Sequence, residues 1–224
     1  MLILGVTTSH PECSIAITHD GHTLCEDIFD GKRTCLEELV PRIERMLQGC
    51  GLDYTDMDLF AVDRGPGGLT GIKIGIVTVR TLAQMARKPA ASCSSLRAMC
   101  CGADADFVFP ATYCSAKDVY YACFQKGSGL PRRLTPDSLG TAGQAAAEFA
   151  KYSTPESLLI GDMAEAVAAH MTEPPRIVAS HPPRAAHVCA LASAAAHQPW
   201  HALQANYLCV TNAESMFAKR KAGS

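Results

Sequence analysis

The first hundred residues contain a distinctive order of apolar segments. Two apolar runs, at residues 2–6 and 14–18, precede the dipeptide Asp20-Gly21, which is typical of hairpin turns, and a mixed stretch at 22–29. This pattern predicts three consecutive strands. A chain that begins with three linked strands must build its core on a sheet.

Helices and strands alternate after the third strand. Apolar residues recur at helical spacing from Leu36 to Leu47. Pro41 is expected to start or kink this helix, and Gly51 is a suitable stop signal. The elements expected next are a strand at 59–62, a glycine-rich loop, a helix at 70–86 and a strand at 90–93. This order predicts an α/β fold with helices packed on a mixed sheet, as in ribonuclease H-like folds.

A second half begins near Ala103, where the signal becomes weaker. Residues 107–111 and 119–125 read as strands that flank a turn at 115–118. Two alanine-rich stretches have helical propensity, and two proline-containing stretches read as loops. The helices are expected at 141–150 and 162–170, and the loops at 172–175 and 181–183.

Composition excludes several classes of protein. Hydrophobic residues make up 48% of the 224 residues and charged residues 19%, which is typical of a globular protein and not of a disordered one. The apolar runs are too short to cross a bilayer, and the N-terminus lacks a secretory signal, so we expect a cytoplasmic protein. A net charge of −2 argues against binding nucleic acid through an overall positive field. The short basic cluster Lys219-Arg220-Lys221 reads as a solvated tail.

The eleven cysteines fit the same cellular compartment. Their number is odd, and no Cys-x-x-Cys spacing occurs. Most lie within apolar runs, such as Cys13 before Ser-Ile-Ala-Ile. We therefore expect buried, reduced thiols.

The glycine-rich loop "RGPGGLTGIKIG", residues 64–75, admits two interpretations. A glycine turn between a strand and a helix exposes N–H groups at the positive end of the helix dipole, which suits a phosphate. The spacing is nevertheless not that of a P-loop, because Ile72 separates Gly71 from Lys73, and Thr70 occupies the last glycine position of Gly-x-Gly-x-x-Gly. The alternative is that glycine allows positive φ angles and close packing of the helix start on the sheet.

The run at 63–83, "DRGPGGLTGIKIGIVTVRTLA", resembles the signature of the bacterial TsaB (YeaZ) family, whose members read GRGPGSFTGxRIG before a helix that ends in GLA. Other segments agree in order. "LGVTTSHPECSIAI" is similar to the opening hairpin, "LEELVPRIERML" to the first helix, "KDVYYACF" to GEVYxAxF and "NYLCVTNAE" to PVYLRxPxA. Residues 129–205 match only in length and general character.

This resemblance implies the fold of the actin, sugar kinase and heat-shock ATPase superfamily. That fold has two ribonuclease H-like subdomains, which we place at 1–103 and 104–224. The second subdomain is degenerate, and its last segment can pack back on the first.

The resemblance also implies partners. TsaD, the catalytic relative, transfers a threonylcarbamoyl group from its adenylate to adenosine 37 of tRNAs that read ANN codons, and the ATPase TsaE completes the complex. TsaB proteins are regarded as non-catalytic, so the metal and the adenylate belong to TsaD, and ATP enters through TsaE. We expect no cofactor in this chain, only indirect contact with tRNA, and no membrane association.

Three departures from the family and its relatives indicate that this chain has no active site. Thr7 stands where active superfamily members carry a magnesium-holding aspartate, and a neutral hydroxyl is a weak ligand. The residues at 113–115 replace the acidic "DAR" motif. The first helix also lacks the His-x-x-x-His pair of TsaD proteins.

The remaining histidines and nucleophiles give no recognisable site. Pro199 breaks the helix that would place His197 and His201 on one face, so a surface loop is expected there. The histidines at positions 10, 19 and 22 cluster around hairpin turns, where exposed polar residues are common. No Gly-x-Ser-x-Gly elbow or cysteine with a recognisable histidine partner supports the older glycoprotease label. We predict no catalytic residue and no metal ligand.

The helix at 70–86 carries apolar residues on two opposite faces. Ile72, Val79 and Ala83 share one face, whereas Ile74 and Val77 lie near the other. Either the helix is fully buried in the monomer, or its outer face contacts another protein. We favour contact with another protein, as TsaB proteins pair through helices of their N-terminal half. The predicted interface residues are Leu36, Leu39, Ile43, Ile74, Val77, Arg80, Thr81 and Met85.

The glycine loop then has a mainly architectural role, with phosphate contact secondary. Its predicted residues are Gly65, Pro66, Gly67, Gly68, Thr70 and Gly71. We expect a non-catalytic subunit that supports TsaD and can also form a homodimer. Two alternatives remain open: a nucleotide-dependent, kinase-like enzyme that uses the cleft between the subdomains, and a self-associating TsaB relative without TsaD.

Overall fold

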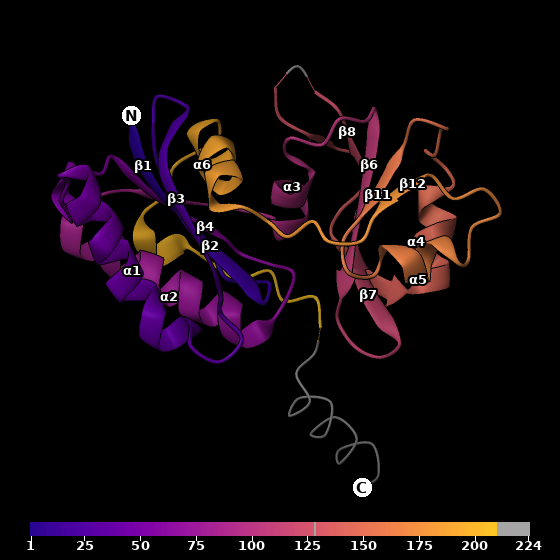
Figure 1. Ribbon diagram of the computed structural model, residues 1–224, viewed down its shortest axis with the longest axis horizontal. Helices are drawn as coiled ribbons and strands as arrows, with labels where there is room; N and C mark the ends of the chain where they lie inside the picture. The colour runs from indigo at the N-terminus through magenta and orange to yellow at the C-terminus, as the bar shows by residue number, and fades with distance from the viewer. Residues whose placement is uncertain (128, 210–224) are drawn as a thin grey trace, which may run out of the picture.

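The computed structural model describes residues 1–127 and 129–209, which form two lobes side by side, each built on one sheet (Figure 1). The first sheet has the strand order β3-β2-β1-β4-β5. β1 pairs antiparallel with β2, and β2 with β3, whereas β4 and β5 run parallel to β1. The strands are β1 (Leu2–Thr7), β2 (Glu12–His19), β3 (His22–Asp30), β4 (Leu59–Asp63) and β5 (Ala90–Cys93).

Two helices, α1 (Cys35–Cys50) and α2 (Leu69–Ala86), cover one face of the first sheet (Figure 1). The short helix η1 (Tyr54–Asp56) precedes β4. Gly51 ends α1 with a φ of 67°, as its predicted role as a stop signal requires. Pro41 does not start the helix, because α1 begins six residues earlier and runs through Pro41. Pro41 is exposed, and so is Glu37, the residue whose carbonyl oxygen loses its helical N–H partner.

The second sheet repeats the connectivity of the first. Its order is β10-β7-β6-β11-β12, with the first three strands antiparallel and the last two parallel to β6. The strands are β6 (Phe107–Tyr113), β7 (Asp118–Tyr121), β10 (Ser138–Thr141), β11 (Leu158–Ile160) and β12 (Arg176–Val178), with β8 (Phe124–Gln125) and β9 (Arg132–Arg133) extending the edge. Helices α4 (Ala142–Phe149) and α5 (Ala164–Ala168) cover its outer face. The structure therefore confirms two ribonuclease H-like units.

Each lobe also receives a helix from the other half of the chain. α3 (Ser95–Cys100) follows β5, yet Leu96 and Met99 share a core cluster with Val108 of β6. α6 (Ala185–Ser193) follows β12 but packs Val188 against Ala61 on the free face of the first sheet. This exchange ties the lobes together, and the boundary at residue 103 stays a prediction.

The second half differs from the sequence prediction in detail. The strand expected at 119–125 is interrupted at Ala122 and Cys123 and forms β7 and β8. The helix expected at 162–170 is shorter, because only Ala164–Ala168 is helical. The sequence did not indicate α3, α6, β11 or β12, which are short and carry little periodicity.

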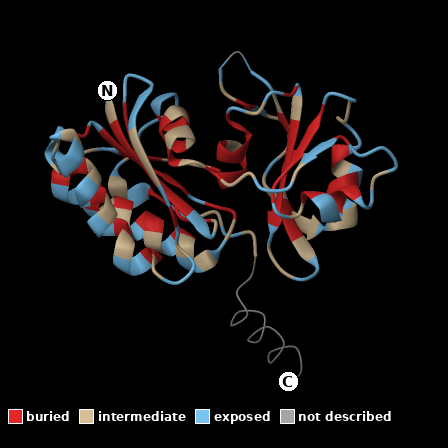
Figure 2. Ribbon diagram, in the orientation of Figure 1, coloured by how far each residue is buried: buried red, intermediate tan, exposed pale blue. Residues whose placement is uncertain are grey.

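Burial is concentrated in the strands and in the inner faces of the helices (Figure 2). Six of the eleven cysteines are buried, as the apolar runs around them predicted. Within the two described ranges, no helix combines the length and the apolar character that a membrane crossing needs. The basic cluster Lys219-Arg220-Lys221 lies outside the described residues.

Candidate functional site

The glycine loop joins β4 to α2 and packs tightly against the β1–β2 connection. Gly65 has a φ of 89°, which a side chain would strain. A Cβ atom at Gly71 would lie 1.9 Å from the carbonyl oxygen of Thr8, so only glycine fits where the two backbones meet. The Thr8 hydroxyl donates a hydrogen bond of 2.8 Å to the carbonyl oxygen of Gly71. This geometry favours the architectural interpretation of the loop.

The six predicted loop residues separate into two groups. Four of them, Gly67, Gly68, Thr70 and Gly71, line a cleft of about 750 Å³ between the lobes. Gly65 and Pro66 lie behind them, where the carbonyl oxygen of Gly65 accepts a hydrogen bond from the N–H of Ser95 at 3.0 Å. The structure thus places part of the loop at the cleft and uses the rest to join β4 to α3. Phosphate contact stays a prediction.

Asp63 is a buried carboxylate that the sequence reasoning missed. It is the last residue of β4, one step beyond the pair Val6–Val62, and therefore stands beside Thr7 at the end of β1. The Thr7 hydroxyl donates to Asp63 Oδ2 at 2.9 Å, and the Thr8 N–H donates to Oδ1 at 3.2 Å. The Ser9 hydroxyl and N–H also donate to this carboxylate.

Burial raises the pKa of Asp63 above its usual range, and these hydrogen bonds oppose the shift only in part. The missing aspartate of β1 is thus matched by a carboxylate on the neighbouring strand, where the family signature has glycine. The signal was visible as "DRGPGG" in place of "GRGPGS". The four donors already occupy the oxygens of Asp63, so Thr7 and Asp63 together do not fit a magnesium ion.

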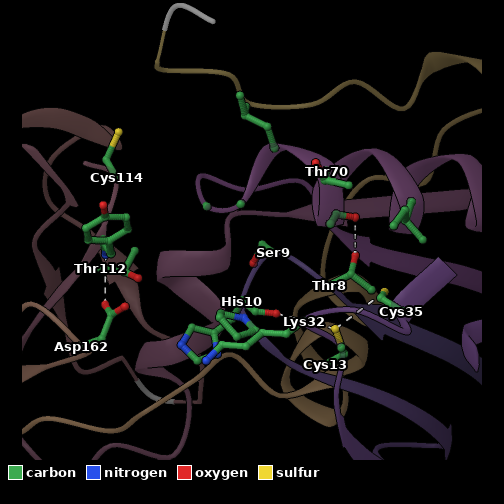
Figure 3. A pocket seen from close by; sticks show the side chains of 18 of the residues that line it. Thr8, Ser9, His10, Cys13, Lys32, Cys35, Thr70, Thr112, Cys114 and Asp162 are labelled. Carbon is green, nitrogen blue, oxygen red and sulfur yellow. Dashed lines mark hydrogen bonds between the residues drawn. The ribbon is translucent and has the colours of Figure 1, made fainter. Parts of the chain in front are cut away.

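The cleft brings together residues from both lobes (Figure 3). Thr8, Ser9 and His10 lie on the side of the first lobe, whereas Thr112 and Asp162 lie opposite. Among its described lining residues Asp162 is the one carboxylate, and its Oδ1 accepts the N–H of Tyr113 at 3.0 Å. The basic residues Lys32 and Arg33 also line the cleft. Its electrostatic character therefore suits an anion better than a divalent cation.

The histidines do not converge on one point. Within the described ranges, no group of three or more His, Cys, Asp or Glu side chains is arranged to hold a metal ion. His10 lines the cleft. His19 lies at the β2–β3 hairpin turn, with its Nε2 3.3 Å from Asp20 Oδ2, and His22 begins the next strand. His197 lies in a loop, as predicted, but His201 lies in the short helix η2 (Trp200–Ala202), which the sequence did not indicate.

The outer side of α1 and α2 exposes large apolar side chains. Leu36 is 74% exposed, Val77 59% and Met85 58%, and Val40 is at 37%. We call these four residues the α1–α2 face. Leu36 and Val40 lie about one helical turn apart on α1, and Leu36 also lines the cleft, whereas Val77 and Met85 lie about two turns apart on α2. Apolar side chains grouped in this way are typical of a surface that contacts another protein.

The other predicted interface residues have different environments. Thr81 is exposed, Ile74 is half-buried against the core, and the half-buried Arg80 donates to the carbonyl oxygen of His201 at 3.3 Å. Leu39 and Ile43, however, are fully buried beneath α1. The prediction was wrong for these two residues, because they lie on the side of the helix that packs on the sheet and cannot reach a partner.

Comparisons with known proteins agree with the sequence motifs. A family model described as "TsaD: tRNA N6-adenosine threonylcarbamoyltransferase" matches residues 30–219. Two curated relatives are named tRNA threonylcarbamoyladenosine biosynthesis protein TsaB. The protein of Bacillus subtilis is 28% identical over 139 residues, and that of Escherichia coli is 32% identical over 130 residues. The alignments cover 61% and 56% of this chain and the same shares of the relatives, so they span less than two thirds of those proteins.

A solved structure extends the likeness to nearly the whole chain. A crystal structure from Pseudomonas aeruginosa, described as an uncharacterized protein with similarity to peptidase YEAZ, superposes with a TM-score of 0.84 at 24% identity. The superposition covers 93% of this chain and 99% of the Pseudomonas aeruginosa chain, which shows that the two have a common fold. The chain therefore belongs to the family described as TsaD: tRNA N6-adenosine threonylcarbamoyltransferase, and within it to the TsaB (YeaZ) group that its glycine loop resembles.

Proposed function

We propose that this chain is a non-catalytic TsaB-type subunit that binds TsaD and supports the formation of threonylcarbamoyladenosine at position 37 of tRNAs that decode ANN codons. It acts in the cytoplasm, in a complex that also includes TsaE. The names of the curated relatives place them in this biosynthesis. The observation that carries the proposal for this chain is the exposed α1–α2 face.

The exposure of the α1–α2 face supports docking. A specific interface buries on the order of 1,600 Å² in total, an area that two adjacent helices can supply. Val77 and Met85 are each more than half exposed, so a partner that covers them removes apolar surface from water. The same face allows a second copy of the chain to dock when TsaD is absent.

The cleft supports a role without chemistry of its own. Asp63 is buried and saturated with hydrogen bonds, and the cleft's described lining has the single carboxylate Asp162. A lone carboxylate in a cleft that Lys32 and Arg33 also line makes a weak magnesium site, which supports this reading. The metal and the threonylcarbamoyl adenylate therefore belong to TsaD in this proposal, ATP enters through TsaE, and tRNA is contacted only indirectly.

The test measures binding of the purified chain to TsaD of the same organism by calorimetry and light scattering. Val77→Asp places a charge among the exposed apolar residues of α2 and is expected to weaken association about tenfold or more. Leu24→Asp is the matched control, because Leu24 on β3 is 50% exposed. Neighbouring residues of a strand face opposite sides of the sheet, and Cys25 packs on the side of α1, so Leu24 faces away from α1. The control is expected to bind like the original chain.

Other outcomes separate the alternatives. Failure to bind TsaD, with and without nucleotide, contradicts the proposal, and self-association that persists under those conditions identifies a relative that works without TsaD. Titration with ATP and magnesium tests the kinase-like alternative. Tight, metal-dependent binding to the isolated chain would favour an enzyme that uses the cleft.

A further inference from the structure

Helix α1 begins and ends with a cysteine, and each of them faces a cysteine of the β2–β3 hairpin. Cys35 at the start lies 3.8 Å from Cys13 of β2, measured between the sulfurs. Cys50 at the end lies 3.2 Å from Cys25 of β3. The second distance exceeds a disulfide bond by only about 1.2 Å.

The Cys25–Cys50 pair differs from the other pair in its access to solvent. Both of its residues are half-buried, whereas Cys13 and Cys35 are buried. Cys25 also lies on β3, the edge strand of the sheet, and Cys50 lies on the last turn of α1. A small reagent can therefore reach this pair without opening the lobe.

The pair is held in place by contacts that do not involve sulfur. Arg42, in the middle of α1, forms an ion pair of 2.9 Å with Asp27 of β3, and its guanidinium lies 4.4 Å from the ring centroid of Phe29. These contacts fix the middle of α1 on β3, two residues from Cys25 along the strand and about two helical turns before Cys50. Bond formation then requires a small movement of side chains and no rearrangement of the helix.

We propose that Cys25 and Cys50 form a reversible dithiol–disulfide site that exchanges with low-molecular-weight disulfides. This inference is independent of the proposed function. The oxidised form links the C-terminal end of α1 to the edge strand and closes a loop of residues 25–50. Because α1 also carries half of the α1–α2 face, the link stabilises the part of the molecule that presents that face.

The exchange is balanced in atoms and electrons. The Cys50 thiolate attacks one sulfur of a disulfide RSSR, which gives a mixed disulfide and releases RS⁻. The Cys25 thiol then loses its proton, attacks the Cys50 sulfur and releases the second RS⁻. Two protein thiols are thereby oxidised to one disulfide, and RSSR is reduced to two RSH. Burial raises the pKa of the Cys25 thiol to about 12, so Cys25 acts second as the resolving thiol.

The sequence provides a direct way to identify the bond. Trypsin leaves Cys13 and Cys25 on the peptide 1–32, Cys35 on 34–42 and Cys50 on 46–64. The full chain is treated with oxidised glutathione, its free thiols are alkylated, and the digest is analysed by mass spectrometry. We expect a linked pair of 1–32 and 46–64, which a phosphine reductant separates. The oxidised chain should also melt about 5–10 °C higher than the reduced chain.

Variants keep the test decisive. Cys50→Ser should abolish both the linked peptide and the thermal shift, whereas Cys93→Ser, which alters a cysteine of β5 outside both pairs, should retain them. Cys13→Ser should also retain the link, which assigns it to Cys25. Three results would each overturn the proposal: glutathione adducts without a linked peptide, a 34–42 link that forms first, or a link that forms only in urea. If Cys50→Ser does not fold, the presence or absence of a reductant-reversible link between peptides 1–32 and 46–64 in the original chain still tests the proposal.

Discussion

The carboxylate of Asp63 serves the local structure at the end of β4. It accepts hydrogen bonds from Thr7, the last residue of β1, and from Thr8 and Ser9, which begin the β1–β2 connection. The glycine loop packs against this same connection, with Gly71 at Thr8. A single buried side chain thereby orders the residues that form one wall of the cleft.

The ionisation of Asp63 should make stability depend on pH. Burial raises the pKa of Asp63 in the folded protein, so Asp63 contributes fully to the free energy of unfolding at pH values below its pKa in the unfolded chain. This contribution is lost as the pH rises through the pKa that Asp63 has in the folded protein. Asp63→Asn cannot titrate but keeps a similar shape. Urea unfolding of both proteins between about pH 4 and 7 should show the original chain losing stability relative to Asp63→Asn as pH rises. The opposite trend would mean that the donors stabilise the ionised form.

At the scale of elements, the return of α6 to the first sheet is the least expected packing. Gly5 of β1 lies directly beneath it, and a Cβ atom there would be 2.4 Å from the Cys189 sulfur and 2.8 Å from the Ala185 carbonyl oxygen. Ala185 in turn donates its N–H to the Ser14 hydroxyl at 2.7 Å. Glu26 of β3 holds the residue before the helix, because its carboxylate pairs with Arg184 at 2.8 Å.

Gly5→Ala is expected to lower the free energy of unfolding by about 1–3 kcal/mol, because the added methyl group must push α6 away from the sheet. Gly49→Ala is the matched control. Gly49 is exposed within α1, and a Cβ atom there meets no atom within 4 Å, so alanine should be neutral or stabilise by up to about 1 kcal/mol. Chemical denaturation of the three proteins checks both values. Equal effects of the two substitutions would contradict the close contact of α6.

At the scale of the whole molecule, the lobes are joined by exchanged helices and by a polar contact centred on Asp137. The side chain of Asp137 is 6% exposed and pairs with Arg133 at 2.6 Å. It also accepts hydrogen bonds from Ser94 and from Asn206, each at 2.9 Å. Asn206 donates its own N–H to the carbonyl oxygen of Arg64 at 2.8 Å, so one carboxylate of the second lobe holds two segments beside the glycine loop.

Asp137→Ala should loosen this junction, because it leaves three donors without their acceptor and costs about 2–4 kcal/mol. Amide hydrogen exchange is expected to accelerate at 94–95 and 204–208 while the centre of each sheet stays protected. Asp104→Ala is the control. It removes an exposed ion pair with Lys126, which solvent screens, and should leave stability and exchange unchanged. Unchanged exchange at the junction would show that the exchanged helices alone hold the lobes.

The sequence by itself determined the first lobe and the glycine loop. Hairpin chemistry at Asp20-Gly21, helical spacing from Leu36 and the stop at Gly51 are local signals, and each appears in the structure where it was predicted. The family likewise followed from a contiguous motif. Local patterns of this kind need no tertiary contact to be recognised.

The tertiary structure decided what depends on contacts between distant residues. It buried Leu39 and Ile43 but exposed Leu36, a distinction set by which side of α1 meets the sheet. It placed Asp63 beside Thr7 through the pairing of β4 with β1, although 56 residues separate them in sequence. It also brought α6 back to the first lobe, although the alanine-rich sequence of α6 does not indicate which sheet the helix packs against. Burial and the approach of remote carboxylates and thiols are properties of packing, which a linear pattern does not contain.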